Sequence, residues 1–125
     1  QKGKKKAAYR LYRKNFRRNS IEIKPNVMIG PGFVIGHPSG IVIGAGTNIG
    51  RNFYIYQGVT LGRAHDKDGY PQIGDNVKMF AGSKAFGNIS IGSNVIIGVN
   101  SVVTKSTDDN CIIVGIPGKV LKYTE

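Results

Sequence analysis

The feature that most limits the fold of this chain is a six-residue repeat that runs from Ile23 to Val103. One position of the repeat, here called the anchor, holds an aliphatic or small apolar residue, and glycine usually follows it directly. A second apolar or small residue stands two positions before most anchors, which is the alternation of a strand. Glycines at this density would cost a helix roughly 1 kcal/mol each, so helices are excluded here. The anchors are Ile23, Ile29, Ile35, Ile43, Ile49, Ile55, Leu61, Ile73, Met79, Ala85, Ile91, Ile97 and Val103.

A further position of the repeat, three residues after the anchor, predicts where the chain bends. It is filled by Gly or Asn, the residues that adopt a left-handed backbone at the lowest cost. These residues are Asn26, Gly32, Gly46, Asn52, Gly58, Asn76, Gly82, Asn88, Asn94 and Asn100. A bend every six residues, with a short strand between bends, winds the chain into a closed coil. We therefore predict an all-β parallel solenoid of about four coils, whose hand the spacing leaves open.

The composition is that of a single domain without a disulfide framework. The chain has 125 residues and one cysteine, Cys111, so we expect a reducing, cytoplasmic compartment. No apolar run reaches the length of a transmembrane helix, and no signal peptide is visible. The first residue is Gln rather than Met, which leaves open a longer natural N-terminus.

The net charge of +11 is concentrated in one segment. Residues 1–18 carry nine Lys or Arg and no acidic residue, whereas the rest of the chain carries nine basic and seven acidic residues. Tyr9, Tyr12 and Phe16 share one face of a helix in this segment. We expect residues 1–20 to form a basic, helical arm that packs its aromatic face on the end of the solenoid. Peripheral attachment to anionic lipid is the alternative, since no recognition motif supports binding of nucleic acid.

The repeat is interrupted at two places, and each interruption contains one of the two histidines. Two extra residues enter within His37-Pro38-Ser39-Gly40, and a polar stretch over residues 63–72 breaks the spacing further on. We expect the second stretch to leave the coil as an excursion loop, and loops on a rigid scaffold often carry function. The β-helix is predicted to span residues 21–105, and residues 106–125 to return and cap its open end.

Three stretches carry a resemblance to a known family. They are residues 36–44 (GHPSGIVIG), 57–62 (QGVTLG) and 114–119 (VGIPGK). With them, residues 20–122 resemble the hexapeptide-repeat acyltransferases, in particular the serine acetyltransferase group and its small relatives in surface-polysaccharide synthesis. The resemblance implies a left-handed β-helix, a homotrimer with active sites between subunits, and acyl transfer from acetyl-CoA with no metal.

The resemblance implies that His37 is the base that takes the proton of the acceptor hydroxyl. Imidazole suits this task near neutral pH, and Pro38 biases His37 towards an extended backbone. Glu22 aligns with the acidic residue, Asp in the family, that orients this histidine from fifteen positions earlier. The alternative for Glu22 is an ordinary exposed side chain. His65 in the excursion loop is the second candidate for the base, or else a solvated loop residue.

The resemblance also implies a coenzyme site. Similarity to the galactoside acetyltransferases places coenzyme contacts at Ala81, Gly82, Val99, Thr104 and Lys105. The backbone amide of Ala81 is the candidate donor to the oxyanion of the tetrahedral intermediate. Lys119 or Lys122 would reach a phosphate of the coenzyme. The alternative for each lysine is an ordinary solvated charge.

The chain departs from the family where the acceptor would bind. Serine acetyltransferases hold the amino-acid carboxylate with an Arg-His pair before a proline, and the residues before Pro71 are Gly69 and Tyr70. The acidic residue that precedes their catalytic histidine is Gly36 here, and their preceding helical domain has no counterpart in this sequence. We therefore expect a neutral acceptor, a sugar or saccharide intermediate of a surface-polysaccharide pathway. The residues expected to bind it are Asp66, Asp68 and Tyr70.

Three other functions are open at this point. The first is serine O-acetyltransferase-type activity on an amino acid. The second is a zinc hydratase, because a carbonic anhydrase family shares the solenoid, but three protein ligands are needed and the two His lie in separate interruptions. The third is a non-catalytic solenoid, which gives no reason for a histidine insertion beside an excursion loop.

Overall fold

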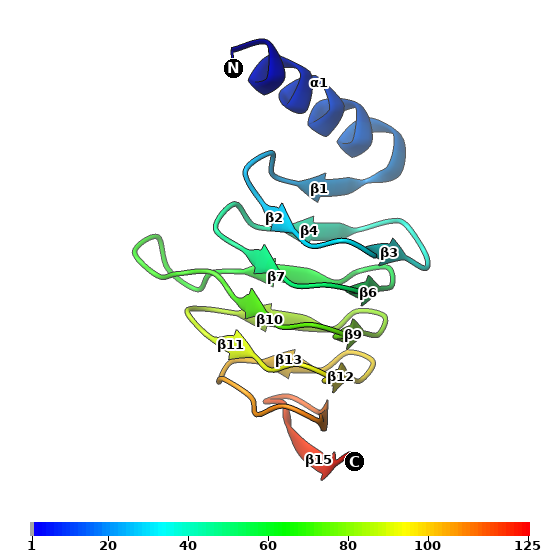
Figure 1. Ribbon diagram of the computed structural model, residues 1–125, viewed down its shortest axis with the longest axis vertical. Coiled ribbons are helices and arrows are strands. Elements are labelled where there is room, and N and C mark those ends of the chain that lie inside the picture. Colours follow the sequence, from blue (N-terminus) through cyan, green and yellow to red (C-terminus); the bar gives the residue numbers. More distant parts are fainter. Residues whose placement is uncertain (1) are drawn as a thin grey trace.

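The computed structural model describes residues 2–125 and shows a three-sided β-solenoid beneath one helix (Figure 1). The first sheet contains β1 (Ile21–Ile23), β4 (Ile41–Ile43), β7 (Thr60–Gly62), β10 (Lys84–Phe86) and β13 (Val102–Val103). The second contains β2 (Met28–Ile29), β5 (Asn48–Ile49), β8 (Gln72–Ile73) and β11 (Ser90–Ile91). The third contains β3 (Val34–Ile35), β6 (Tyr54–Ile55), β9 (Lys78–Met79), β12 (Ile96–Ile97), β14 (Cys111–Val114) and β15 (Lys119–Tyr123).

Each strand pairs in parallel with the strand one turn further along the chain, so β1 to β14 wind through almost five turns. Only β15 turns back, and it lies antiparallel on β14 at the end of the third sheet. Thr60 pairs with Lys84, 24 residues later, because the excursion loop intervenes, whereas Lys84 pairs with Val102 after 18 residues. The predicted parallel solenoid, its helical arm and its single excursion loop are confirmed.

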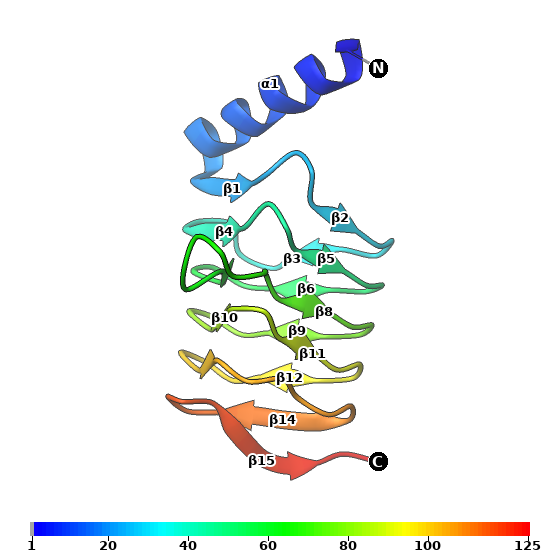
Figure 2. The ribbon, with the colours of Figure 1, turned by 90° about the vertical axis from the view of Figure 1, so that its left-hand side faces the viewer.

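The predicted core is present in every coil except the first. All anchors from Ile43 to Val103 are buried, and Phe53, Val59, Val77 and Val95 fill the space between them. In the first coil Ile21 is buried, but the anchors Ile23 and Ile35 are only half-buried, because the helix covers only part of that end of the solenoid (Figure 2). The solenoid therefore has one continuous core that thins towards the helix.

Three columns of corners join the sheets, and each is named here by what it carries. The asparagine corner comprises residues 30–33, 50–53, 74–77, 92–95 and 107–110. The histidine corner comprises residues 36–40, 56–59, 80–83, 98–101 and 115–118. The loop corner comprises residues 24–27, 44–47, 63–71, 87–89 and 104–106.

The predicted left-handed bends are found at two of these corners and not at the third. Seven of the ten positions have a positive φ, and the exceptions, Asn26, Gly46 and Asn88, all lie at the loop corner. There Thr47 N–H donates to the Gly44 carbonyl at 3.1 Å, and Val27 bonds in the same way three residues back. The same type of bond also closes the histidine corner beside left-handed Gly82, so the bond does not explain the difference. The prediction was wrong at the loop corner, where Gly87, one position before Asn88, is the one left-handed residue among those that the structure describes.

The asparagine corner is tied together by a ladder of side chains. The amide of Asn52 donates to Asn76 at 3.0 Å, Asn76 to Asn94 at 3.1 Å, and Asn94 to Asn110 at 2.9 Å. All four are left-handed, with φ between 54° and 56°. Each rung therefore serves two purposes, since the side chain that tolerates the bend also bonds to the next coil.

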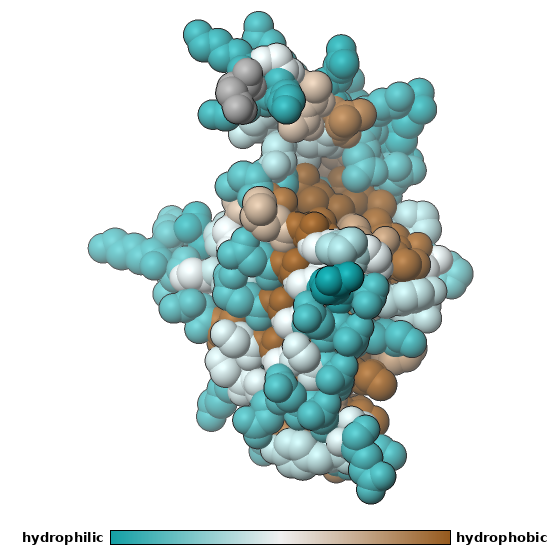
Figure 3. Space-filling view, in the orientation of Figure 1, coloured by the Kyte–Doolittle hydropathy of each residue, from teal (hydrophilic) through white to brown (hydrophobic). Residues whose placement is uncertain are grey.

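The helix α1 (Lys2–Asn19) lies across the first coil and is attached to it mainly through Tyr12. The Tyr12 hydroxyl donates to Glu22 Oε1 at 2.9 Å, and Lys24 Nζ donates to the Tyr12 hydroxyl at 3.0 Å. Tyr9 and Phe16 are each 53% exposed, so the expected aromatic face packs at one ring rather than three. Figure 3 shows hydrophilic side chains over the helix and hydrophobic surface on the first coil below it. No helix within residues 2–125 is both long and apolar enough to cross a membrane.

Candidate active site

His37 is exposed at the top of the histidine corner, between β3 and β4. Its ring centroid lies 6.0 Å from that of Tyr56, which stacks on Phe80 of the next coil at 5.2 Å. Tyr54 packs beside Tyr56 at 5.2 Å, and its hydroxyl raises the pKa of Tyr56. A row of aromatic rings therefore leads from His37 down this corner, a feature that the hexad pattern did not predict.

Three of the expected coenzyme residues, Ala81, Gly82 and Val99, lie in the same corner below His37. The amide groups of Gln57, Ala81 and Val99 donate to no backbone carbonyl within residues 2–125. The left-handed residues beside them carry the bonds between coils, as when Gly82 N–H donates to the Gln57 carbonyl at 2.9 Å. The corner thus presents a column of free backbone donors beneath an exposed imidazole, which suits an extended ligand with amide and carbonyl groups.

The other expected coenzyme residues lie elsewhere on the chain. Thr104 and Lys105 are exposed at the loop corner, across the first sheet from Ala81. Lys119 and Lys122 are exposed on β15, at the last edge of the third sheet. One copy of the chain therefore does not gather the whole predicted set around His37.

Glu22 is engaged by partners that the sequence reasoning missed. Its carboxylate forms an ion pair with Lys24 at 2.8 Å and accepts the Tyr12 hydroxyl. The bond from Lys24, and then that from Tyr12, hold the pKa of Glu22 below its usual value. No hydrogen bond or ion pair joins Glu22 to His37 within residues 2–125. Lys24 stands two positions after Glu22 on an extended segment, a spacing that puts both on one face. The role of Glu22 in orienting His37 stays a prediction.

The excursion loop is closed by bonds among its own residues. The His65 amide donates to Asp68 Oδ2 at 3.0 Å, and the Asp68 amide donates to the His65 carbonyl at 2.9 Å. The His65 side chain is exposed and bonds to no residue that the structure describes. Its geometry is that of a solvated loop residue, and its place as an alternative base stays a prediction.

Tyr70 and Arg63 form a stack at the base of this loop. The Tyr70 ring lies on the backbone of the preceding coil, where a Cβ on Gly46 would come within 2.5 Å of ring Cδ2 and one on Gly44 would also collide. The guanidinium carbon of Arg63 lies 5.3 Å from the centroid of the same ring. Sequence reasoning singled out Tyr70 but missed Arg63, whose position depends on how the loop folds.

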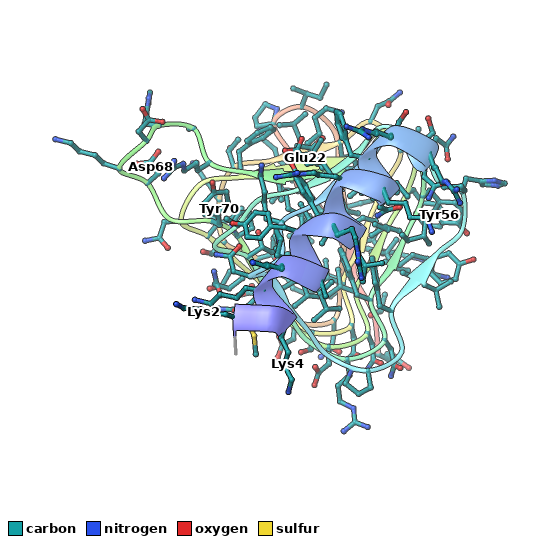
Figure 4. The ribbon with its side chains drawn as sticks, turned by 90° about the horizontal axis from the view of Figure 1, so that it is seen from above. Lys2, Lys4, Glu22, Tyr56, Asp68 and Tyr70 are labelled. Carbon is teal, nitrogen blue, oxygen red and sulfur yellow. The ribbon has the colours of Figure 1, made fainter. Side chains whose placement is uncertain are left out.

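The two parts of the candidate site lie on different sides of one chain. In Figure 4, which looks down on the helix, Tyr56 is on one side of the solenoid, and Asp68 and Tyr70 are on the opposite side. From β4 onward, the histidine corner precedes each strand of the first sheet and the loop corner follows it, so the two corners are separated by the length of these strands. The part of the chain from residue 2 onward also contains no group of three or more His, Cys, Asp or Glu arranged to hold a metal ion.

The fold and these corners define a hexapeptide-repeat β-helix, and comparisons with known proteins narrow the class. The chain is 52% identical over 104 residues to a serine acetyltransferase of Staphylococcus epidermidis, and 51% identical to one of Staphylococcus aureus. Both matches cover 82% of this chain and 49% of the relative, so the chain spans about half the length of these relatives. No family model matches.

Solved structures give the same result. A serine acetyltransferase from Brucella abortus in complex with coenzyme A superposes with a TM-score of 0.93 at 32% identity. One from Neisseria gonorrhoeae superposes with a TM-score of 0.92 at 35% identity. The two matches cover 99% of this chain and 50% and 48% of the respective solved chains. The coils described here are therefore a serine acetyltransferase-like, left-handed β-helix, as the sequence resemblance implied.

The expectation of a sugar or saccharide acceptor is wrong. The relatives at 51–52% identity are serine acetyltransferases, and nothing in the comparisons supports polysaccharide synthesis. The expectation assumed that no positive charge stands where Gly69 and Tyr70 replace the family's pair, yet Arg63 lies directly over the Tyr70 ring. The missing helical domain carries no weight either, because the chain spans only about half of these relatives.

Proposed function

We propose that this protein is an acetyl-CoA-dependent O-acetyltransferase whose acceptor is the hydroxyl of serine. The observation that carries the proposal is an exposed histidine above a column of free backbone amides, in a chain 52% identical to a serine acetyltransferase. The coenzyme A complex of the Brucella abortus protein supports the choice of acyl donor.

The proposed reaction needs only groups that the histidine corner supplies. His37 removes the proton of the serine hydroxyl, and the oxygen attacks the thioester carbonyl of acetyl-CoA. The amide of Ala81 donates to the oxyanion that forms, which is the group whose charge grows in the transition state. The intermediate then releases the coenzyme thiolate, which takes up the proton from the His37 imidazolium, and O-acetylserine remains.

We further propose that the protein acts as a homotrimer with its sites between subunits. The separation of Tyr56 and Tyr70 in Figure 4 supports this, since a second copy is needed to place the excursion loop beside His37. The outward positions of the third sheet are also mostly apolar: they hold Val34, Tyr54, Ile96 and Ile112, with Lys78 between Tyr54 and Ile96. Light scattering should show a trimer at micromolar concentration, and a stable monomer would contradict the intersubunit site.

The arm supports a further proposal, that α1 associates with an anionic lipid surface. Four basic residues follow one another at intervals of four, three and four positions, which aligns them in one row on the helix. They are Lys6, Arg10, Arg13 and Arg17. All four are exposed, and α1 contains no acidic residue. Binding to vesicles containing phosphatidylserine should weaken steeply with salt and disappear when the four become Glu. Binding that ignores salt, or no binding, would leave α1 as a packing element.

The proposed activity is tested by a coenzyme-release assay with acetyl-CoA and a panel of acceptors. We expect L-serine to be acetylated, with O-acetylserine identified by mass spectrometry. Homoserine and threonine in the panel report how tightly the site holds the hydroxyl. If no amino acid in the panel causes release of coenzyme, the proposed acceptor is refuted. If the protein does not bind acetyl-CoA, the reaction class is refuted.

A further inference from the structure

We infer that Arg63, held on the face of Tyr70, binds the carboxylate of the amino-acid acceptor. The inference rests on the proposed function, because only an amino acid brings a carboxylate to this site. Arg63 and Tyr70 stand at the two ends of the excursion loop, and no repeat position or motif in the sequence assigns a role to Arg63.

Tyr70 is a rigid platform for this arginine. One face of its ring lies on the Gly44–Gly46 backbone, which is close enough that a side chain at either glycine would collide with the ring. The Arg63 guanidinium also lies over this ring, 5.3 Å from its centroid, an arrangement that attracts a cation to the ring electrostatically. A guanidinium fixed in this way loses less freedom when it binds a ligand than one on a free side chain.

The guanidinium keeps most of its donors available. Its Nη1 donates to the Asp66 backbone carbonyl at 2.6 Å, which sets the direction of the group. The Asp66 carboxylate forms an ion pair with Nη2 at 3.8 Å, but this distance is too long for a hydrogen bond, so the pair leaves the donors of the fork free. Within the described chain no other acceptor bonds to Arg63, and its side chain is 38% exposed. A planar fork with free donors matches a carboxylate in two-point geometry.

The alternative role for Arg63 is to close the loop and nothing more. The bond to the Asp66 carbonyl would serve that role, and so would stacking on Tyr70. A structural arginine and a carboxylate-binding arginine differ in one respect, which is whether its removal matters more for a charged acceptor than for a neutral one. The experiment below measures that difference.

The experiment compares L-serine with L-serinamide, which keeps the hydroxyl and the ammonium but replaces the carboxylate with a neutral amide. In wild type, serine should be the better acceptor. Arg63→Gln should raise the KM for serine by ~10-fold or more, the range for loss of a hydrogen bond to a charged group. The KM values for serinamide and acetyl-CoA should stay the same. Arg63→Lys should recover part of the loss, because it restores the charge without the fork.

Lys67→Gln is the matched control, because Lys67 is an exposed cation of the same loop, and no cation–π contact joins it to Tyr70 within residues 2–125. It should behave like wild type with both acceptors. An equal loss for serine and serinamide in Arg63→Gln, or an equal effect of Lys67→Gln, would overturn the inference and leave the acetyltransferase proposal standing. Wild type that acetylates neither acceptor while still binding acetyl-CoA would overturn the proposed function and the inference together.

A mixing experiment tests whether Arg63 serves the His37 of another copy, as the proposed trimer requires. Co-expressed Arg63→Gln and His37→Ala chains form some interfaces in which both residues are intact. At a serine concentration below the KM, hybrid trimers should therefore be more active than the mean of the two pure variants. Activity equal to that mean would contradict a site shared between copies.

Discussion

The asparagine and histidine corners solve the same backbone problem in different ways. Both need a left-handed residue in each coil, and the asparagine corner uses Gly32 in the first coil and Asn52, Asn76, Asn94 and Asn110 in the others. At the histidine corner the left-handed residues are Gly40, Gly58, Gly82 and Gly115, and Asn occurs only at position 100. An asparagine side chain at such a position can add hydrogen bonds between coils, whereas glycine leaves the backbone uncovered.

The difference indicates that one corner stabilises the solenoid and that the other leaves its backbone accessible to a ligand. Side chains of the asparagine corner are exposed, but their amide groups already bond to one another from coil to coil. At the histidine corner the free amides of Gln57, Ala81 and Val99 line an edge that carries no such ladder. We therefore expect substitutions at the first corner to change stability and substitutions at the second to change activity.

His37→Ala is the strongest test of this division. Removing the proposed base should lower kcat by at least ~100-fold, the usual contribution of general-base catalysis. The melting temperature should not change, since the side chain is exposed and forms no hydrogen bond or ion pair within residues 2–125. Steady-state kinetics and thermal unfolding on the same preparation give both values. Activity close to wild type would reject His37 as the base and turn attention to His65.

Asn76→Ala is the corresponding test at the asparagine corner. The change removes two ladder bonds and puts Ala at φ 54°. The free energy of unfolding should fall by about 3 kcal/mol, from about 1 for each bond and 1–2 for the backbone. Activity per folded molecule should be unchanged. Asn76→Gly tolerates the bend, so in urea unfolding it should lose only part of this stability. A loss of catalysis without a loss of stability would break the comparison.

Gly58→Asn places the left-handed asparagine that is typical of the asparagine corner into the histidine corner. Asparagine tolerates the φ of 73° found at Gly58 better than most side chains, but its Cβ would lie 3.3 Å from Gly82 Cα, which is closer than an ordinary contact, so stability should fall by about 1 kcal/mol. The new side chain covers the amide column and should raise the KM for acetyl-CoA roughly tenfold, or about 1.4 kcal/mol. An unaltered KM would show that the coenzyme does not use this corner.

The smallest expected effect concerns Glu22, in the first coil, which the asparagine ladder does not reach. Its pKa in the folded state is below the ordinary 4.5 because Lys24 and Tyr12 bond to the carboxylate. The pair therefore stabilises the folded protein above pH 4.5, and this contribution is lost as the pH falls through the lowered pKa. The groups are partly exposed, so the gain is below about 1 kcal/mol. Glu22→Gln should lower the melting temperature slightly at pH 7 and not at pH 3, whereas Glu125→Gln should have no such pH-dependent effect.

The sequence alone predicted the regular parts of the fold, because the period of the repeat decides which side chains face inward. Every anchor from Ile43 onward is buried where the repeat places it. The bends at the loop corner were not predictable in this way, since Gly46 and Asn88 occupy the same repeat position as the left-handed residues but do not adopt a left-handed backbone. The ladder from Asn52 to Asn110 was also missed, because spacing predicts a bend but not what the side chain then does.

The candidate site was predicted less completely, for the same reason. His37 and the residues Ala81, Gly82 and Val99 were expected from family resemblance, and they share one corner because the repeat places them there, although their roles stay predictions. Arg63 was missed because its contact with Tyr70 joins two ends of an irregular segment. Residues outside the period are positioned by contacts, and contacts between irregular segments leave no regular trace in the order of amino acids.

The pairing register bears on how such a loop could arise. Strands that flank the excursion loop pair across 24 residues instead of 18, so the insertion lengthens the segment closed by each turn by six residues. The entropy of closing a flexible segment grows only with the logarithm of its length, so this change costs about 0.3 kcal/mol. A single rung of the asparagine ladder exceeds that amount. The stacked coils can therefore accept new loops at almost no thermodynamic cost, and evolution can vary the acceptor site while the scaffold stays the same.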